Sequence, residues 1–448
     1  MELGNGGGGG GGESESEANR ARLSFNDTTG KDHLSALPND ALVIILLNLS
    51  TRDAVRTSIL SRRWRRVWAL LPGLTFDSDT NPHQIVSALQ AHEAALRFLL
   101  VFSRNATAES RATSVTLHLG FLGFAVPPVG VFTRLRELWL SSIWLQGPGL
   151  LSDIISWPRC PCLQRLTIRD ARGLDNLAIH SRSLQIMDLT NMRGLRQLTI
   201  VAPALEVLKV KLCFYYSRSQ PVASITAPQL GTLLWSDLYD PSSVHLGKME
   251  HLRLLNPFVF TVYGNNGVTL NPSCLSLLRR FTVIEHLILT LFYQQNMDNN
   301  QYMMEDKTML PDITILHLYV NANGHRFGAS AFHVLRMCSG IRRLMLTLAE
   351  AEQQNWETKH LLLNRLEEVE IDQFRGSEHE FTFVKQLFVW ATALEKMTVT
   401  FDDSVTESVA MELGQVLQSF SRQETHMEIA LVENLRSSKL YSTWHAEE

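Results

Sequence analysis

The first strong hydrophobic pattern in the chain lies between Leu34 and Leu71. Every residue from Ala41 to Leu47 is apolar, and Pro38 suits the first turn of a helix, where its missing N–H would have no partner. One helical stripe with i, i+3, i+4 and i+7 spacing consists of Leu42, Ile45, Leu46 and Leu49. A helix that is apolar nearly all round must be buried nearly all round. We therefore expect one side to pack on its own module and another to bind a second protein.

Two further short helices are predicted before Leu71. Ser50 and Asp53 have the spacing of a capping pair that starts the second helix. The apolar side chains expected to face inward from that helix are Val55, Ile59 and Leu60. The third helix carries Trp64 and Trp68 at helical spacing, with arginines between them. Three short helices make only a small core, at the size where a partner usually adds stability.

From Val115 onward the pattern changes to a recurring L-x-x-L-x-L motif. Its copies are Leu135-Leu138-Leu140, Leu163-Leu166-Ile168, Leu184-Met187-Leu189, Leu205-Leu208-Val210, Met249-Leu252-Leu254, Ile284-Leu287-Leu289, Ile313-Leu316-Leu318, Ile341-Leu344-Leu346, Leu366-Val369-Ile371 and Leu394-Met397-Val399. The copies that start at 163, 184 and 205 are 21 residues apart, a period typical of leucine-rich repeats. Later intervals are longer, so we expect an irregular solenoid.

A second series of the motif interleaves with the first. Leu174-Leu177-Ile179 and Leu195-Leu198-Ile200 are also 21 residues apart, which indicates two strands per turn and sheet on both faces. Outer helices are expected where the interval lengthens, at Cys274 to Phe281 and Ala329 to Cys338. Period-2 alternation directs the motif residues inward and their neighbours to the concave face. That outward set is Glu137, Trp139, Arg165, Thr167, Arg169, Ile186, Asp188, Val207 and Lys209.

The N-terminal stretch resembles the F-box in its plant version. The residues that carry the resemblance are Leu37-Pro38-Asn39-Asp40, Leu42, Ile45-Leu46, Leu49, Asp53, Thr57 to Trp64, and Val67-Trp68. At Leu47 to Ser50 this chain lacks the proline that many relatives have. The resemblance implies docking on the Skp-type adaptor of a cullin ubiquitin ligase. Matched to the F-box pattern position by position, the residues that would contact the adaptor or support those contacts are Leu37, Pro38, Leu42, Ile45, Leu46, Leu49 and Trp64.

Three later segments resemble the FBD region of the same plant group: Leu366 to Gly376, Phe383 to Leu387 and Leu394 to Thr398. They predict a strand, a helix and a strand that continue and close the solenoid. Between the F-box and the repeats, His83 to Arg104 predicts an amphipathic helix. The predicted domains are a disordered glycine-rich tail (1–30), the F-box (31–75), a linking strand and capping helix (76–112), leucine-rich repeats (113–355), an FBD-like region (356–425) and a C-terminal segment (426–448). The fold class is α/β.

Composition limits the possible classes of protein. The chain has 448 residues, 45% hydrophobic and 19% charged, with a formal net charge of −4, which is too balanced for a dedicated nucleic-acid binder. Its scattered cysteines indicate a reducing compartment. The longest apolar run, Ala41 to Leu47, falls well short of the roughly 20 residues that span a bilayer, and no secretory signal is evident. We expect a cytosolic or nuclear protein with no membrane contact.

No catalytic constellation stands out. The glycine run from Gly6 to Gly12 fits a phosphate-binding motif only trivially, and the common nucleotide, zinc-protease and hydrolase motifs are missing. Cys160 and Cys162 lack a second ligand pair at zinc spacing, and Cys213 and Cys338 suit small buried apolar groups. The acidic group Glu367, Glu368, Glu370 and Asp372 favours a solvated face over an acid–base pair. We expect no enzymatic activity, no cofactor and no metal.

The predicted function is substrate recognition in a Skp–cullin–F-box ubiquitin ligase. A target protein is expected on the outward face of the repeats, at Trp139, Arg165, Arg169, Asp188 and Lys209, whereas Trp144, Trp157 and Trp235 suit packing. The alternative is a protein-binding repeat scaffold with no ligase role, its first helices packing on its own repeats. The arginines between 52 and 66 suit an acidic adaptor and also leave a nucleic-acid binder as a third possibility.

Overall fold

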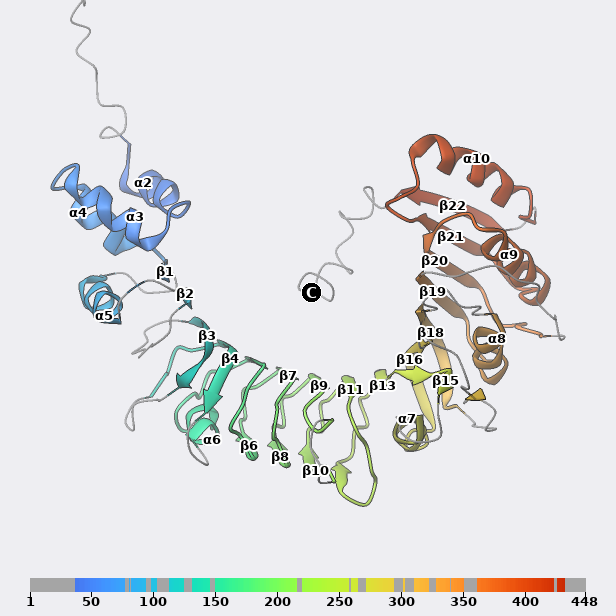
Figure 1. Cartoon of the computed structure of the whole chain (residues 1–448), viewed down its shortest axis with the longest axis horizontal. Helices are drawn as coiled ribbons and strands as arrows, with labels where there is room; N and C mark the ends of the chain where they lie inside the picture. Colours follow the sequence, from blue (N-terminus) through green and yellow to red (C-terminus); the bar gives the residue numbers. More distant parts are fainter. Residues whose placement is uncertain are drawn as a thin grey trace, which may run out of the picture.

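The chain forms an open arc with a long parallel sheet along its inner side (Figure 1). The computed structural model describes residues 37–431 except 77–79, 81, 94–97, 103–112, 125–130, 146–149, 216–219, 258, 265–270, 294–300, 303–309, 322–327, 339, 350–360 and 423–424. The predicted glycine-rich tail, 1–30, lies outside the described residues. A small helical module lies at one end of the arc, and α7, α8 and α9 line its outer side (Figure 1).

The helical module contains α2 (Asn39–Leu46), α3 (Thr51–Arg56), the 3-10 turn η1 (Thr57–Ile59), α4 (Trp64–Val67) and the 3-10 turn η2 (Trp68–Leu70). Pro38 stands just before α2, and the Ser50 side chain accepts a hydrogen bond from the Asp53 amide at 3.2 Å, which confirms the predicted cap of α3. The buried core of the module is Leu42, Leu46, Ala54, Trp64, Val67, Trp68, Ala69 and Leu71.

The prediction that Ile59 and Leu60 face inward is wrong, because both are exposed. The chain leaves the α-helix after Arg56 and enters η1. A 3-10 helix turns in three residues instead of 3.6, so Ile59 and Leu60 rotate away from the side on which Val55 packs.

The predicted helix from His83 to Arg104 is wrong in its second half. The structure has α5 (Pro82–Ala91) and then the strand β2 (Phe98–Phe102). This strand pairs in parallel with β1 (Gly73–Phe76) on one side and with β3 (Ser114–Phe124) on the other. Phe98-Leu99-Leu100-Val101-Phe102 is a continuous apolar run, as is typical of a parallel strand covered on both faces. Strand pairing therefore overrides the helical spacing.

The main sheet follows the arc from end to end. After β3 its path runs through β4 (Glu137–Leu145), β5 (Arg165–Arg169), β7 (Ile186–Thr190), β9 (Val207–Lys211), β11 (Thr232–Ser236), β13 (Leu254–Pro257), β16 (Val283–Phe292), β18 (Asp312–Asn321), β19 (Arg343–Ala349), β20 (Glu368–Phe374), β21 (Lys396–Phe401) and β22 (His426–Leu431). Every neighbouring pair is parallel. The short strand β14 (Phe260–Thr261) pairs with β16, and β15 (Tyr263–Gly264) and β17 (Gln301–Tyr302) form a separate two-stranded antiparallel sheet.

The inward positions of the repeats are confirmed except in one copy. The predicted copy Met249-Leu252-Leu254 is shifted by one residue at its end, because Leu255 is the buried side chain and aligns with Leu233 on β11 and Leu287 on β16. The copy before it, Leu230-Leu233-Trp235, was not predicted because tryptophan replaces its last leucine. All three of its side chains are buried.

The second sheet confirms the interleaved series. It consists of β6 (Asn176–His180), β8 (Gln197–Val201), β10 (Val222–Thr226) and β12 (Val244–Leu246). The last two strands were not predicted, because Ala223 in β10 and Val244 in β12 stand at the middle leucine of the motif and neither copy has a leucine at its first position. The predicted outer helices are present as α7 (Asn271–Leu278) and α8 (Gly328–Met337), and α9 (Glu378–Trp390) lies in the FBD-like region as expected. The structure adds α6 (Leu150–Ile155) and α10 (Glu407–Gln418).

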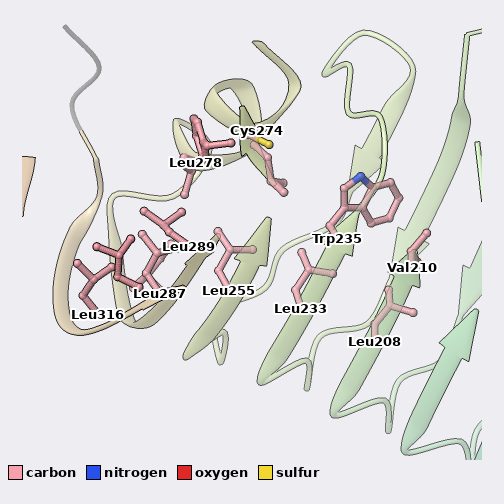
Figure 2. Packing of buried hydrophobic residues seen from close by; sticks show 14 of the residues in the cluster. Leu208, Val210, Leu233, Trp235, Leu255, Cys274, Leu278, Leu287, Leu289 and Leu316 are labelled. Atoms are coloured by element: carbon pink, nitrogen blue, oxygen red, sulfur yellow. The ribbon is translucent and has the colours of Figure 1, made fainter. Parts of the chain in front are cut away.

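One hydrophobic core extends through the repeats. Figure 2 shows Leu208, Leu233, Leu255 and Leu287 on successive strands, with Cys274 and Leu278 nearby on α7. Each turn therefore buries its apolar residues only against its neighbours, as in other solenoids.

The helical module is joined closely to the first strand of this solenoid. The Thr75 amide donates to Thr51 Oγ1 at 2.6 Å, and the ring Nε2 of buried His92 lies 2.8 Å from the Leu71 carbonyl oxygen. Ala88 of α5 packs against both cores. These contacts fix the module against the end of the arc.

Candidate protein-binding surfaces

The helical module leaves six large apolar side chains at least partly exposed. We call them together the N-terminal apolar surface; they are Ile44, Ile45, Leu47, Leu49, Ile59 and Leu60. Ile59 is 84% exposed, Leu60 68% and Ile44 64%. Isolated exposed aliphatic residues are ordinary, but several on one small module indicate a protein interaction site.

The seven residues predicted from the F-box resemblance differ in their burial. Leu42, Leu46 and Trp64 are buried in the core of the module, so they shape it and offer no contact surface. Pro38, Ile45 and Leu49 are exposed, and Leu37 is half-buried against the core. The prediction missed Ile44, Leu47, Ile59 and Leu60. The all-round apolar character of α2 pointed to the first two, whereas the 3-10 turn that exposes the others has no clear sequence signal.

Several arginines lie on the same module. Arg63 donates to the Leu37 carbonyl oxygen and to Asn39 Oδ1, the latter at 2.9 Å, and so ties α4 to the start of α2. Arg56 pairs with Asp53 at 3.2 Å, and Arg66 with Glu93 at 3.6 Å, both at exposed positions. Arg63 therefore has a structural role. The exposed arginines of the module, which we call the basic rim, are Arg52, Arg56, Arg62, Arg65 and Arg66.

On the inner side of the arc, the structure brings the five predicted target-binding residues together on neighbouring strands. Arg165 pairs with Glu137 at 3.8 Å, and the Arg169 guanidinium lies 4.6 Å from the centre of the Trp139 ring. Asp188 Oδ2 lies 3.2 Å from Arg169 Nη2 and 3.1 Å from Lys209 Nζ. Trp139 thus lies at the predicted outward position, but it is half-buried beneath the Arg169 guanidinium.

The acidic group of the FBD-like region is also paired. Arg342 lies 3.7 Å from Glu367, and Arg343 lies 3.5 Å from Glu368 and 3.1 Å from Glu370. Because arginines pair with three of these carboxylates and leave an excess of negative charge, the group resembles an ordinary charged sheet face rather than an acid–base pair.

The cysteines of the described chain have the character of structural thiols. Burial raises the pKa of Cys160 to about 11 and that of Cys338 to about 12, and it raises the pKa of Cys213 well above its usual value. Such thiols stay protonated at neutral pH and are poor nucleophiles. Cys162 is exposed, and no disulfide joins any of these cysteines.

Of the three tryptophans predicted to pack against the repeats, two are more exposed than expected. Trp235 is buried, as expected, but Trp144 and Trp157 are largely exposed. The Arg182 guanidinium lies 4.9 Å from the centre of the Trp157 ring. The reason is the position of each residue: Trp235 occupies the inward position of a repeat copy, whereas Trp144 and Trp157 lie outside the motif.

In the part of the chain that the structure describes, no helix has the length and apolar character needed to cross a membrane. The same residues include no group of three or more metal-binding side chains.

Comparison with protein families finds matches for both the helical module and the repeats. The family model of the F-box domain matches residues 34–74, and a model described as the LRR repeats of FBD-associated F-box protein At5g56370 matches residues 100–241. A putative F-box/FBD/LRR-repeat protein of Arabidopsis thaliana, At4g03220, is 26% identical over 449 residues, covering 82% of this chain and 89% of that protein. F-box/LRR-repeat protein 13 of the same plant is 23% identical over 454 residues, covering 86% and 93%. A third relative, F-box/FBD/LRR-repeat protein At5g53840, is 58% identical over 48 residues, 11% of each chain.

Proposed function

We propose that this chain, an F-box protein with leucine-rich repeats similar to the plant F-box/FBD/LRR-repeat proteins, is the substrate-recognition subunit of a Skp–cullin–F-box ubiquitin ligase. Its F-box module docks on a Skp-type adaptor, and its repeats hold a target protein. The chain itself carries out no bond chemistry. The free cysteines fit the reducing cytosol or nucleus in which we place it.

The observation that carries this proposal is the N-terminal apolar surface. Burying one large aliphatic side chain contributes about 1.5–3 kcal/mol, whereas association costs roughly 4–15 kcal/mol. A single anchor is therefore insufficient. Burial of Ile44, Leu47, Ile59 and Leu60 together exceeds the lower part of that range, and the basic rim suits an acidic partner.

The close junction between module and arc gives the second part of the proposal. Because Thr51, Leu71 and Ala88 connect the F-box core to the first strands, a target on the repeats is held at a fixed position relative to the adaptor. The contribution of the chain is then a high effective concentration of target lysines near an enzyme supplied by other subunits.

The test is binding of the full-length chain to a purified Skp-type adaptor. The double substitution Ile59→Asp with Leu60→Asp is expected to weaken binding at least about 100-fold, because it removes roughly 3–6 kcal/mol of apolar burial. Val283→Asp is the matched control, since Val283 is 68% exposed on the solenoid. Leu46→Asp is unsuitable because Leu46 is buried and its loss would unfold the module. Equal binding by wild type and the double variant rejects the docking assignment.

The scaffold alternative makes a different prediction for the same experiment. A repeat scaffold with no ligase role gives no adaptor binding by the wild-type chain. In one form of the scaffold alternative, the first helices pack on the repeats and so cover the N-terminal apolar surface. The exposure of Ile44 and Ile59 weighs against that form. A nucleic-acid binder that uses the arginine rim requires an affinity that falls steeply with added salt.

A further inference from the structure

Charge is distributed unevenly along the concave face of the main sheet. On β4 to β9 the cations Arg165, Arg169, Lys209 and Lys211 outnumber the anions Glu137 and Asp188. On β19 to β22 the anions Glu368, Glu370, Asp372 and Glu428 outnumber the cations Arg343 and Lys396. We call these groups the basic end and the acidic end. The internal ion pairs at each end leave an excess of one sign, so the face is polarised along the arc.

Between the two ends lies a band of uncharged, half-buried side chains. This central band consists of Leu234, Leu254, Ile288, Ile315, Tyr319 and Met345. They lie on β11, β13, β16, β18 and β19, at outward positions between the buried repeat residues. The His317 and Tyr319 rings stack within the band, with centroids 4.0 Å apart. The band is therefore preformed on one sheet, and its neighbours at outward positions, such as Thr232, Asn256 and Thr290, are polar but uncharged.

This arrangement has the anatomy of a protein interface. Interface centres are depleted in charge and enriched in aromatic residues and methionine, while charged groups lie at the rim. Six strand steps separate β9 from β20, and at about 4.8 Å per step the two charged ends are roughly 29 Å apart along the sheet. A helix of about 19 residues has that length, at 1.5 Å per residue.

We propose that the concave face binds a target segment with acidic residues at one end, an apolar centre and basic residues at the other end. The acidic residues of the target lie against Lys209 and Lys211, and its basic residues lie against Glu368 and Glu370. Opposite charges at the two ends fix the direction of the segment, because the reversed direction places like charges together. This inference rests on the proposed function, since it names the class of target that the receptor takes.

A nucleic acid fits this face poorly. A polyanion needs cations along its whole path, whereas Glu368, Glu370 and Asp372 would repel it at one end and the central band offers it no charge. A uniformly acidic or uniformly basic protein is disfavoured for the same reason. The distribution of charge thus selects a bipolar partner.

The experiment uses a displayed library of random 20-residue peptides, selected on the full-length chain. The expected result is enrichment of peptides with acidic residues toward one terminus, apolar residues in the middle and basic residues toward the other. Lys211→Glu and Glu368→Lys are each expected to weaken the enriched peptides about tenfold. Peptides whose acidic end is changed to lysine are expected to bind Lys211→Glu better than wild type. Lys248→Glu is the matched control, because it makes the same charge change at an exposed loop position after β12 and leaves affinity unchanged.

Three outcomes overturn the proposal: no enrichment, enriched peptides without a charge gradient, or affinities that Lys211→Glu and Glu368→Lys leave unchanged. Adaptor binding by the same preparations separates this proposal from the ligase assignment. The Ile59→Asp/Leu60→Asp variant is expected to keep peptide binding. If the wild-type chain binds bipolar peptides but no adaptor, only the ligase role is refuted. If it binds the adaptor but the enriched peptides have no charge gradient, only the proposed charge pattern of the target is refuted.

Discussion

Gly173, in the turn between β5 and β6, occupies a position that only glycine fits without strain. Its φ is +78°, in the region that disfavours residues with a Cβ. A Cβ at this position would also lie 2.8 Å from Trp144 Cδ1 and close to the Leu145 carbonyl oxygen. Gly194, one turn later, has a φ of +98° but open space around it. Comparing the two positions therefore separates the effect of backbone conformation from the effect of steric crowding.

Gly173→Ala is expected to destabilise the protein more than Gly194→Ala does. The Gly194 variant carries only the cost of a left-handed conformation, roughly 1–2 kcal/mol. The Gly173 variant adds the cost of overpacking, typically about 1–3 kcal/mol. Urea unfolding of both variants measures the difference. Equal losses of stability would mean that Trp144 and Leu145 move aside freely.

Asp237 stabilises a buried turn through its carboxylate. Its oxygens accept hydrogen bonds from the amides of Cys213, Phe214 and Leu238, the last two at 2.9 Å. Asp237→Ala leaves these donors without their acceptor, and each unsatisfied buried donor costs about 1–3 kcal/mol. We expect a loss of at least about 2 kcal/mol and faster hydrogen exchange at Cys213 and Phe214. Asp240→Ala, at a surface turn closed by Ser242, serves as control and should have less than half of this effect.

The same carboxyl group makes stability depend on pH. Burial raises the pKa of Asp237 from 3.8 to about 6, against the opposing effect of its amide donors. The folded chain therefore binds more protons than the unfolded chain between pH 4 and 6, and stability falls as pH rises through this window. Two pKa units correspond to about 3 kcal/mol. The measurement is the free energy of unfolding of wild type and Asp237→Asn at pH 4, 5 and 6, and the decline should be smaller in the variant. Equal declines in the two proteins would mean that other groups cause the pH dependence.

At the scale of elements, the helices of the FBD-like region begin in two different ways. The Ser377 side chain accepts from the Glu380 amide at 3.3 Å, and the Glu380 carboxylate accepts from the Ser377 amide at 2.8 Å, a complete capping box at the start of α9. Thr406 stands before α10 without a side-chain capping bond. Ser377→Ala is expected to cost about 1 kcal/mol, and Thr406→Ala much less. Thermal unfolding distinguishes the two, and similar shifts would show that the capping box contributes little.

Sequence patterns predicted the elements in which all three inward positions of the motif carry leucine, isoleucine, valine or methionine. The strands at 163–210 and 284–399 follow directly from the motif, and so does the second sheet as far as β8. Prediction failed where another residue occupies the inward position, as Trp235 does in β11 and Ala223 in β10. It also failed where pairing partners decide the conformation, since only β1 and β3 show that Phe98–Phe102 is a strand.

At the scale of the whole molecule, the two candidate surfaces were predictable to different degrees. The F-box pattern pointed to the module that carries the proposed adaptor surface, but three of its residues, Leu42, Leu46 and Trp64, are buried and can only support a contact, because the spacing marks core and contact residues alike. The exposed pair Ile59 and Leu60 depends on the 3-10 turn after Arg56. The polarity of the concave face needed the strand register, which brings Lys209 beside Asp188 and Arg343 beside Glu368.

The central claim is that the N-terminal apolar surface is the place where a Skp-type adaptor binds. Hydrogen exchange of the full-length chain, measured with and without purified adaptor, tests it most directly. The account predicts slower exchange in the segments that contain Ile44 to Leu49 and Thr57 to Leu60, with no change on β5 to β9. A complex that leaves these segments unchanged, or that protects the concave face instead, would contradict it.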